Sequence, residues 1–163
     1  MDLKSKTCCF TGHRDVPKED IPLIRKALFE KIVELREIGI VYYGAGGALG
    51  FDTIAAQTVI DVRDQFPEVK LILVLPCREQ ANKWSHRDKM MYNDIIQRAD
   101  KTMYVSEHYH PGCMHERNRH LVDESSYCIC YLTRSSGGTK YTVDYAAKHG
   151  LEIFNIAEAI SGA

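Results

Sequence analysis

The chain reads Ile40-Val-Tyr-Tyr-Gly-Ala-Gly-Gly-Ala-Leu-Gly50 where an apolar run passes directly into a glycine-rich loop. Residues 51–66 follow with apolar side chains at helical spacing, and residues 69–75 form the most continuous apolar run of the chain. These patterns predict a strand, a loop, a helix and a second strand that is covered on both faces. Because parallel neighbours need such a crossover connection, the segment predicts a β-α-β unit.

The same alternation extends in both directions from this segment. We predict strands at residues 7–11, 40–43, 69–75, 101–105, 127–132 and 151–156. We predict helices at residues 21–35, 51–66, 85–99, 114–125 and 139–149. The alternation indicates one α/β domain over residues 1–163, with a Rossmann-like, mostly parallel sheet of about six strands and helices on both faces. Local patterns do not predict the order of the strands.

The composition provides no overall field that would attract acidic partners. The 163 residues are 45% hydrophobic and 26% charged, and 21 Lys and Arg against 22 Asp and Glu give a formal net charge of -1. This balance disfavours nucleic acid as a partner. The longest strongly apolar run is far shorter than the roughly 20 residues that span a bilayer, and the first residues lack a signal-peptide pattern. We therefore expect a cytoplasmic protein with no membrane partner.

Cysteine and histidine do not form a metal-binding pattern. The six cysteines include no C-x-x-C pair, and Cys128 and Cys130 lie inside an apolar run, which favours buried free thiols. His115 and His120 are separated by about 500° around a helix, so they do not share a face. We expect neither a metal nor a cofactor.

Unusual residues follow the first two predicted strands, at the edge where ligands bind in such sheets. Thr11-Gly-His-Arg14 offers a hydroxyl, an imidazole and a guanidinium that suit phosphate or carboxylate, the alternative being a solvated turn. Further on, Gly46, Gly47 and Gly50 would let backbone N–H groups approach an anion in front of a positive helix end. This loop is no dinucleotide fingerprint, because Leu49 stands where G-x-G-x-x-G requires glycine.

Four more segments carry candidate binding residues. Asp52 opens the helix after the glycine loop, where it either stabilises the positive helix end or bonds a ligand hydroxyl. Trp84 follows the third strand and suits either stacking on a base or a hydrophobic lid. Arg117 lies early in the next helix, with its side chain directed towards the strand ends. Residues 133–139 form a second glycine loop that enters a helix.

The candidate segments form an ordered set of motifs: Thr11-Gly-His-Arg14, Gly46-Gly-Ala-Leu-Gly-Phe-Asp52, Gln80 with Trp84, Arg117-Asn118, Val122-Asp123, and Gly137-Gly-Thr139 with Tyr141 and Ala146. In combination and in this order, these motifs resemble those of a known bacterial family, the family of unknown function typified by YpsA. It belongs to the SLOG superfamily, with DprA and the LOG phosphoribohydrolases. The resemblance covers nearly the whole chain and implies a Rossmann-like fold with a pocket for a nucleotide or nucleotide-derived ligand; the superfamily also suggests a homodimer.

The likeness to LOG enzymes implies an enzymatic alternative. Met114-His-Glu-Arg117 resembles their M-x-x-R-K segment, whose arginine belongs to the active site, and the second glycine loop resembles theirs. The catalytic glutamate of that loop aligns with Thr142, and the nearest carboxylate is Asp144, two positions later. If the protein is an enzyme, the resemblance implies a phosphoribohydrolase with Arg117 and Asp144 as catalytic residues.

Three functional hypotheses follow from these observations. The first is binding of a nucleotide or nucleotide-derived ligand at the C-terminal edge of the sheet, for sensing or regulation. The alternatives are cleavage of a nucleoside monophosphate at its N-glycosidic bond and DprA-like binding of single-stranded DNA, which the near-neutral charge weakens. The candidate ligand-binding residues are Thr11, Gly12, His13, Arg14, Gly46, Gly47, Gly50, Asp52, Gln80, Trp84, Arg117, Asn118, Gly137, Gly138 and Thr139.

Overall fold

The computed structural model describes residues 2–161, which form a sheet of six parallel strands in the order β4-β3-β2-β1-β5-β6. The strands are β1 (Thr7–Gly12), β2 (Tyr42–Ala45), β3 (Lys70–Leu75), β4 (Lys101–Tyr104), β5 (Tyr127–Tyr131) and β6 (Glu152–Asn155). The α-helices are α1 (Ile21–Glu37), α2 (Phe51–Gln65), α3 (His86–Arg98), α4 (Cys113–Asp123), α5 (Gly138–Lys148) and α6 (Ile156–Ser161). Two 3-10 turns are η1 (Lys4–Lys6) and η2 (Lys18–Asp20). The predicted Rossmann-like α/β fold is confirmed.

Local sequence explains the ends of several elements. Ser85 caps α3, because its hydroxyl accepts a hydrogen bond from the backbone N–H of Asp88 at 3.1 Å. The last strand is shorter than predicted, since Ile156 already belongs to α6. There the side chain of Asn155 accepts a hydrogen bond from the backbone N–H of Ala157 at 3.0 Å, which favours the start of a helix.

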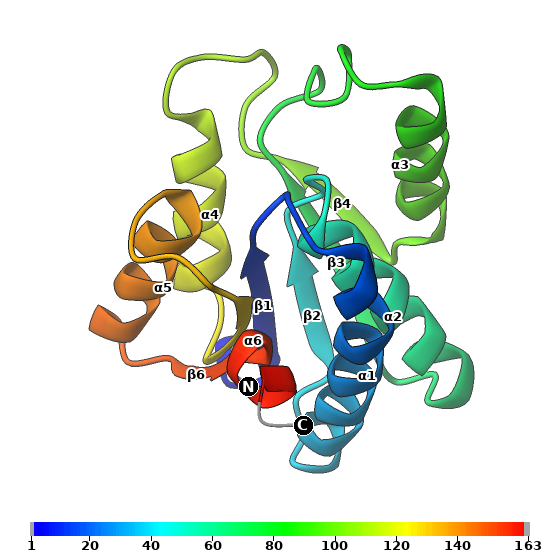
Figure 1. Cartoon of the computed structure of the whole chain (residues 1–163), viewed down its shortest axis with the longest axis vertical. Helices are drawn as coiled ribbons and strands as arrows, with labels where there is room; N and C mark the ends of the chain where they lie inside the picture. Colours follow the sequence, from blue (N-terminus) through cyan, green and yellow to red (C-terminus); the bar gives the residue numbers. More distant parts are fainter. Residues whose placement is uncertain (1, 162–163) are drawn as a thin grey trace.

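Helices cover both faces of the sheet. Figure 1 shows α1, α2 and α3 on one side of the strands and α4 and α5 on the other. This division follows from right-handed crossovers. The chain steps from β1 to β4 in one direction and then returns across the sheet to β5 and β6. Helix α6 packs against α1.

The core consists of two apolar layers that the sheet separates. In β3, Leu71 and Leu73 face the layer beneath α1, α2 and α3, while Ile72 and Val74 face the layer beneath α4 and α5. Both sets of side chains meet apolar neighbours, which explains why residues 69–75 are apolar almost without interruption. All six cysteines are free and buried.

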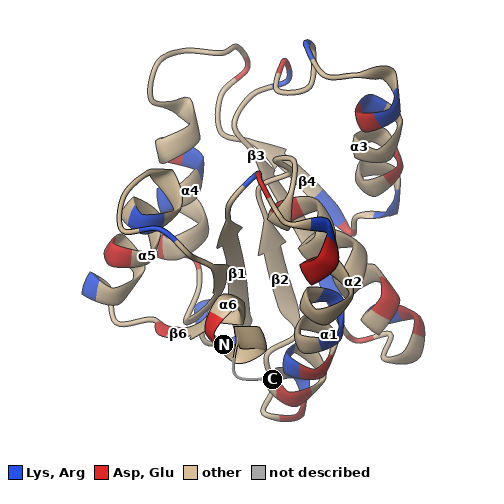
Figure 2. Ribbon diagram, viewed as in Figure 1, with Lys and Arg blue, Asp and Glu red and all other residues tan. Residues whose placement is uncertain are grey.

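Charged residues of both signs are mixed over the molecule. Figure 2 shows Lys and Arg next to Asp and Glu on α1, α3 and α5. Within the described residues, no helix is long and apolar enough to cross a bilayer.

Candidate functional site

The strand order changes direction between β1 and β5. One connection leaves β1 towards β2, while β5 lies on the opposite side of β1 and its chain continues away to β6. The helices that follow β1 and β5 cover opposite faces of the sheet, so the two loops diverge and leave a crevice at the C-terminal ends of the strands. A cavity of about 360 Å³ occupies this crevice. We call it the switch-point cavity.

Most of the predicted binding residues line this cavity. The lining residues are Thr11, Gly12, His13, Arg14, Asp15, Ala48, Asp52, Met114, Arg117, Asn118, Arg134, Ser136, Gly137, Gly138 and Thr139. Sequence reasoning did not include Asp15, and it included Ala48 and Met114 only as parts of longer motifs. It included Arg134 and Ser136 only as parts of the second glycine loop, although the position of that loop after a strand could have identified them as candidates.

His13 ties the loop after β1 to its neighbours. Its Nε2 accepts a hydrogen bond from the backbone N–H of Thr133 at 2.9 Å, and its carbonyl accepts one from the N–H of Phe51 at 3.1 Å. The side chain is buried, and burial, with a smaller contribution from the charge of Arg134, lowers its pKa. The imidazole is therefore held in its neutral form with the proton on Nδ1.

Arg117 brings a buried positive charge to the cavity. It is only 4% exposed, and its guanidinium donates hydrogen bonds to the carbonyl of Gly46 and to Oδ1 of Asn118, the latter at 2.7 Å. It forms no ion pair within residues 2–161, although the charge of Asp52 acts on it. Burial lowers its pKa, and Asp52 opposes this effect. A buried cation without a paired anion favours the binding of an anionic ligand.

Asp52 lies in the first turn of α2 and borders the same cavity. Its Oδ2 accepts a hydrogen bond from the backbone N–H of Ala48 at 3.3 Å. Burial raises its pKa, and the charge of Arg117 and this hydrogen bond counteract the rise. Both roles predicted for Asp52 are compatible with this position, at a helix end and on the cavity wall.

The amino-terminal end of α5 completes the cavity. Gly137 precedes the helix with φ 101°, a conformation that favours glycine, and no side chain caps this end. The first N–H groups of a helix have no partner inside the helix, and they carry a partial positive charge. Since Gly138 and Thr139 line the cavity, these groups are placed to bind an anion.

The first glycine loop lies behind the cavity. A Cβ at Gly50 would lie 2.2 Å from the carbonyl oxygen of Arg14, and one at Gly47 would lie 2.5 Å from the side chain of Leu75. A Cβ at Gly46 would overlap the guanidinium of Arg117. These three predicted binding residues are therefore packed against the protein, and only Ala48 of this loop borders the cavity.

Gln80 and Trp84 also lie outside the switch-point cavity. The side chain of Gln80 donates hydrogen bonds to the carbonyl of Gly46 at 3.5 Å and to the hydroxyl of Tyr92 at 3.3 Å. The ring of Trp84 meets that of Tyr92 edge to face, with 5.1 Å between centroids, and together with Gly47 it lines a separate, much smaller cavity. The contacts of Trp84 are those of a hydrophobic lid over the glycine loop.

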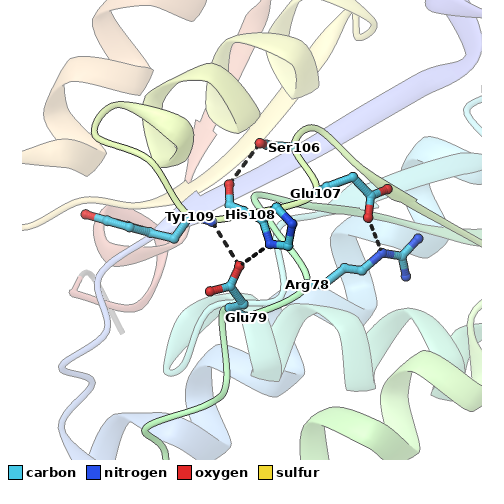
Figure 3. A network of polar contacts seen from close by, with 6 residues as sticks. All are labelled: Arg78, Glu79, Ser106, Glu107, His108 and Tyr109. Carbon is cyan, nitrogen blue, oxygen red and sulfur yellow. Dashed lines mark hydrogen bonds and ion pairs between the residues drawn. The ribbon is translucent and has the colours of Figure 1, made fainter.

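A polar network joins the loops after β3 and β4, as Figure 3 shows. Nε of Arg78 donates to Glu107 at 2.7 Å. Glu79 lies 2.9 Å from Nδ1 of His108 and accepts a hydrogen bond from the backbone N–H of Tyr109 at 3.2 Å. The pairs connect residues about 30 positions apart, so sequence reasoning did not find them.

The two residues named for an enzyme are separated. Arg117 lines the cavity, whereas Asp144 lies on the exposed side of α5 and pairs with Lys140 at 2.8 Å. Thr142, at the aligned glutamate position, is buried and donates a hydrogen bond to the carbonyl of Gly138 at 2.9 Å. The carboxylates that line the cavity are those of Asp15 and Asp52.

The fold and cavity define a Rossmann-like α/β protein with a polar site at the switch point of its sheet. The profile of the YpsA family, described as the YspA SLOG family, matches residues 8–157. The chain therefore belongs to this family, as the sequence motifs predicted.

Relatives of the chain occur in several bacilli. This chain is 28% identical over 131 residues to UPF0398 protein BH1768 of Halalkalibacterium halodurans, and the aligned region covers 78% of this chain and 69% of the relative. It is 30% identical over 115 residues to the uncharacterized SPbeta prophage-derived protein YoqJ of Bacillus subtilis, and that aligned region covers 63% of this chain and 67% of the relative.

Two solved structures of DNA processing protein A share the fold. The protein from Helicobacter pylori superposes with a TM-score of 0.65 and the one from Streptococcus pneumoniae with 0.70, each at 19% identity over 94% of this chain. This chain spans 66% and 50% of their respective lengths. At this identity the likeness shows a common fold.

This likeness corrects one prediction. The Helicobacter pylori structure is described as revealing a single-stranded DNA binding mode. The prediction that disfavoured a nucleic-acid partner is therefore wrong, because it relied on the net charge of the whole chain. Phosphate contacts depend on where individual arginines lie, and a net charge near zero does not exclude a local group of them.

Proposed function

We propose that the protein binds a nucleotide or nucleotide-derived ligand in the switch-point cavity, for sensing or regulation. The observation that carries this proposal is the lining of the cavity, where Arg14, Arg117 and Arg134 accompany the uncapped start of α5. Guanidinium and backbone N–H groups together bind phosphate well. The volume of about 360 Å³ falls within the usual range of small-molecule sites, about 300–1,000 Å³.

Different sides of the cavity suit different parts of such a ligand. The phosphate would lie at the start of α5, within reach of Arg14 and Arg134. The sugar or base would face Asp52 and Asn118, whose carboxylate and amide can bond hydroxyl and ring nitrogen groups. Arg117 is held by the Gly46 carbonyl and by Asn118, so it contributes its charge from a fixed position.

Calorimetric titration with nucleoside monophosphates and the matched nucleosides tests this proposal. We expect the monophosphates to bind more tightly than the nucleosides. The double variant Arg14→Ala, Arg134→Ala should lower the affinity for the monophosphates by about tenfold or more, since a hydrogen bond to a charged group contributes about 1.5–3 kcal/mol. Arg87→Ala, on the exposed surface of α3, is the control. Equal affinities for both sets of compounds would contradict a phosphate site.

A second candidate function is binding of single-stranded DNA, which the likeness to DNA processing protein A favours. Fluorescence anisotropy with a labelled oligothymidylate at several salt concentrations tests it. If the three arginines of the cavity carry the phosphate contacts, the slope of log affinity against log salt should be about -2, because each single-strand contact contributes about -0.7. A slope that Arg14→Ala leaves unchanged would contradict DNA binding at this cavity.

Hydrolysis is tested by incubation with nucleoside monophosphates and chromatography of the products. We expect no free base, because Asp144 lies outside the cavity in an ion pair with Lys140. Release of base that Asp144→Asn abolishes would overturn this expectation and establish the phosphoribohydrolase alternative.

A further inference from the structure

A second cavity adjoins the switch-point cavity. It has a volume of about 770 Å³, and Arg14, Asp15 and Arg134 line both cavities. We call it the side cavity. It lies between the loop after β1 and the loop after β5, so a ligand bound at the shared arginines has room on two sides.

The side cavity has the surface of a site for a ring-bearing group. Val16 and Pro17 supply apolar surface, while Asp20 and Thr133 supply a carboxylate and a hydroxyl. Tyr131 forms part of the wall and is held rigidly, because its ring stacks on that of Phe51 with 6.0 Å between centroids. Apolar walls with a few polar groups are typical of small-molecule sites.

Two arginine side chains at the junction of the two cavities, Arg14 and Arg134, are available to bind a ligand. Arg134 pairs with Asp15 at 3.5 Å, but both side chains are largely exposed, and such pairs are weak and easily exchanged. The side chain of Arg14 makes no hydrogen bond or ion pair with any other residue of the range 2–161. A phosphate at this junction therefore meets two guanidinium groups at little cost in existing contacts.

Building on the proposed function, we propose that the ligand contains two nucleosides joined by a phosphate bridge. One nucleoside occupies the switch-point cavity, the bridge lies at Arg14 and Arg134, and the second nucleoside occupies the side cavity. A free dinucleotide and a stretch of single-stranded nucleic acid share this chemistry.

Competition titrations with matched probes test the inference. The probes are adenosine 5′-monophosphate, diadenosine diphosphate, the 5′-phosphorylated dinucleotide pdApdA and an oligodeoxyadenylate, with guanine analogues as a second series. We expect the two-nucleoside probes to bind about tenfold more tightly than the monophosphate. Thr133→Trp should reduce this ratio to about one, because Thr133 is exposed and lines only the side cavity.

Matched variants keep the test independent of folding. Thr133→Ser keeps the hydroxyl and adds no bulk, so it should preserve the ratio, while Pro17→Trp obstructs the side cavity from its other wall and should reduce it. If monophosphates bind and the second nucleoside does not increase the affinity in either the adenine or the guanine series, the inference is overturned and the proposed function stands. If no probe binds, both are overturned. A further gain with the oligonucleotide supports a strand as the source, and equal affinity supports a free dinucleotide.

Discussion

His13 makes the loop after β1 sensitive to pH. Its hydrogen bond from the N–H of Thr133 requires a neutral Nε2, and burial lowers the pKa of the ring. The unfolded chain therefore binds more protons than the folded one at a pH below the ordinary histidine pKa of about 6.5. The free energy of unfolding should fall as the pH drops from about 6.5 through the lower pKa of the folded state.

We predict that His13→Asn removes part of this fall. Urea unfolding from about pH 8 to pH 5 should show a shallower dependence for the variant than for the natural protein. His86→Asn, at the exposed start of α3, is the matched control and should retain the natural dependence. Parallel curves for His13→Asn and the natural protein would refute the prediction.

Asp52 and Arg117 influence each other's ionisation. Burial raises the pKa of Asp52 and Arg117 counteracts it, so we predict that Arg117→Met raises this pKa further. Carbon-detected NMR titration of the aspartate carboxyl groups measures the change. A raised pKa also means that the folded state loses stability relative to Asp52→Asn as the pH rises above the ordinary value of about 3.9. A carboxyl that titrates below that value would refute this.

At the scale of elements, Gly50 and Gly138 offer a matched comparison. Gly50 has φ 81° and backs onto the backbone of Arg14, whereas a Cβ at Gly138 would have no neighbour within 4 Å. We predict that Gly50→Ala lowers the free energy of unfolding by about 2 kcal/mol or more, through backbone strain and the clash. Gly138→Ala should leave it unchanged or raise it by up to about 1 kcal/mol. Denaturant unfolding of the two variants measures both changes. Equal changes in the free energy of unfolding would contradict the close packing of the first glycine loop around Gly50.

The network between the loops after β3 and β4 predicts a local effect. Glu79→Gln should speed hydrogen exchange at the N–H of Tyr109, because the carboxylate accepts this N–H and its charge holds His108. The denaturation midpoint should hardly change, since exposed pairs contribute little to global stability. Glu68→Gln, which breaks an exposed pair with Arg36 elsewhere, should leave exchange at Tyr109 unaltered. Equal exchange in both variants would count against the network.

At the scale of the whole molecule, ligand binding should raise the melting temperature. A nucleotide at about 100 times its dissociation constant adds about 2.7 kcal/mol of stability. For a domain of this size, 1 kcal/mol corresponds to about 2–4 °C, so we predict a rise of about 5–10 °C. Matched nucleosides should give smaller shifts in the same differential scanning experiment. Equal shifts would argue against a phosphate site at α5.

The elements themselves could be predicted from local patterns. The two ends of each predicted strand lie within two residues of the observed ends. A buried strand such as residues 69–75 needs apolar side chains on both faces wherever it lies in the sheet, so its sequence alone marks its position. Helix α6 was not predicted, since it has six residues and buries only Ile156. A single buried residue produces no periodic pattern.

The sequence by itself determined that residues following the strands would gather at one edge, because all strands of a parallel sheet end there. That β1 and β5 are neighbours, which brings Thr11 and Thr139 into one cavity, was decided only by the tertiary structure. The roles of Gly46, Gly47 and Gly50 were decided there too. A glycine leaves space that either a ligand or another part of the chain can fill. Only the three-dimensional packing shows that Arg117, Leu75 and Arg14 fill the space next to these glycines.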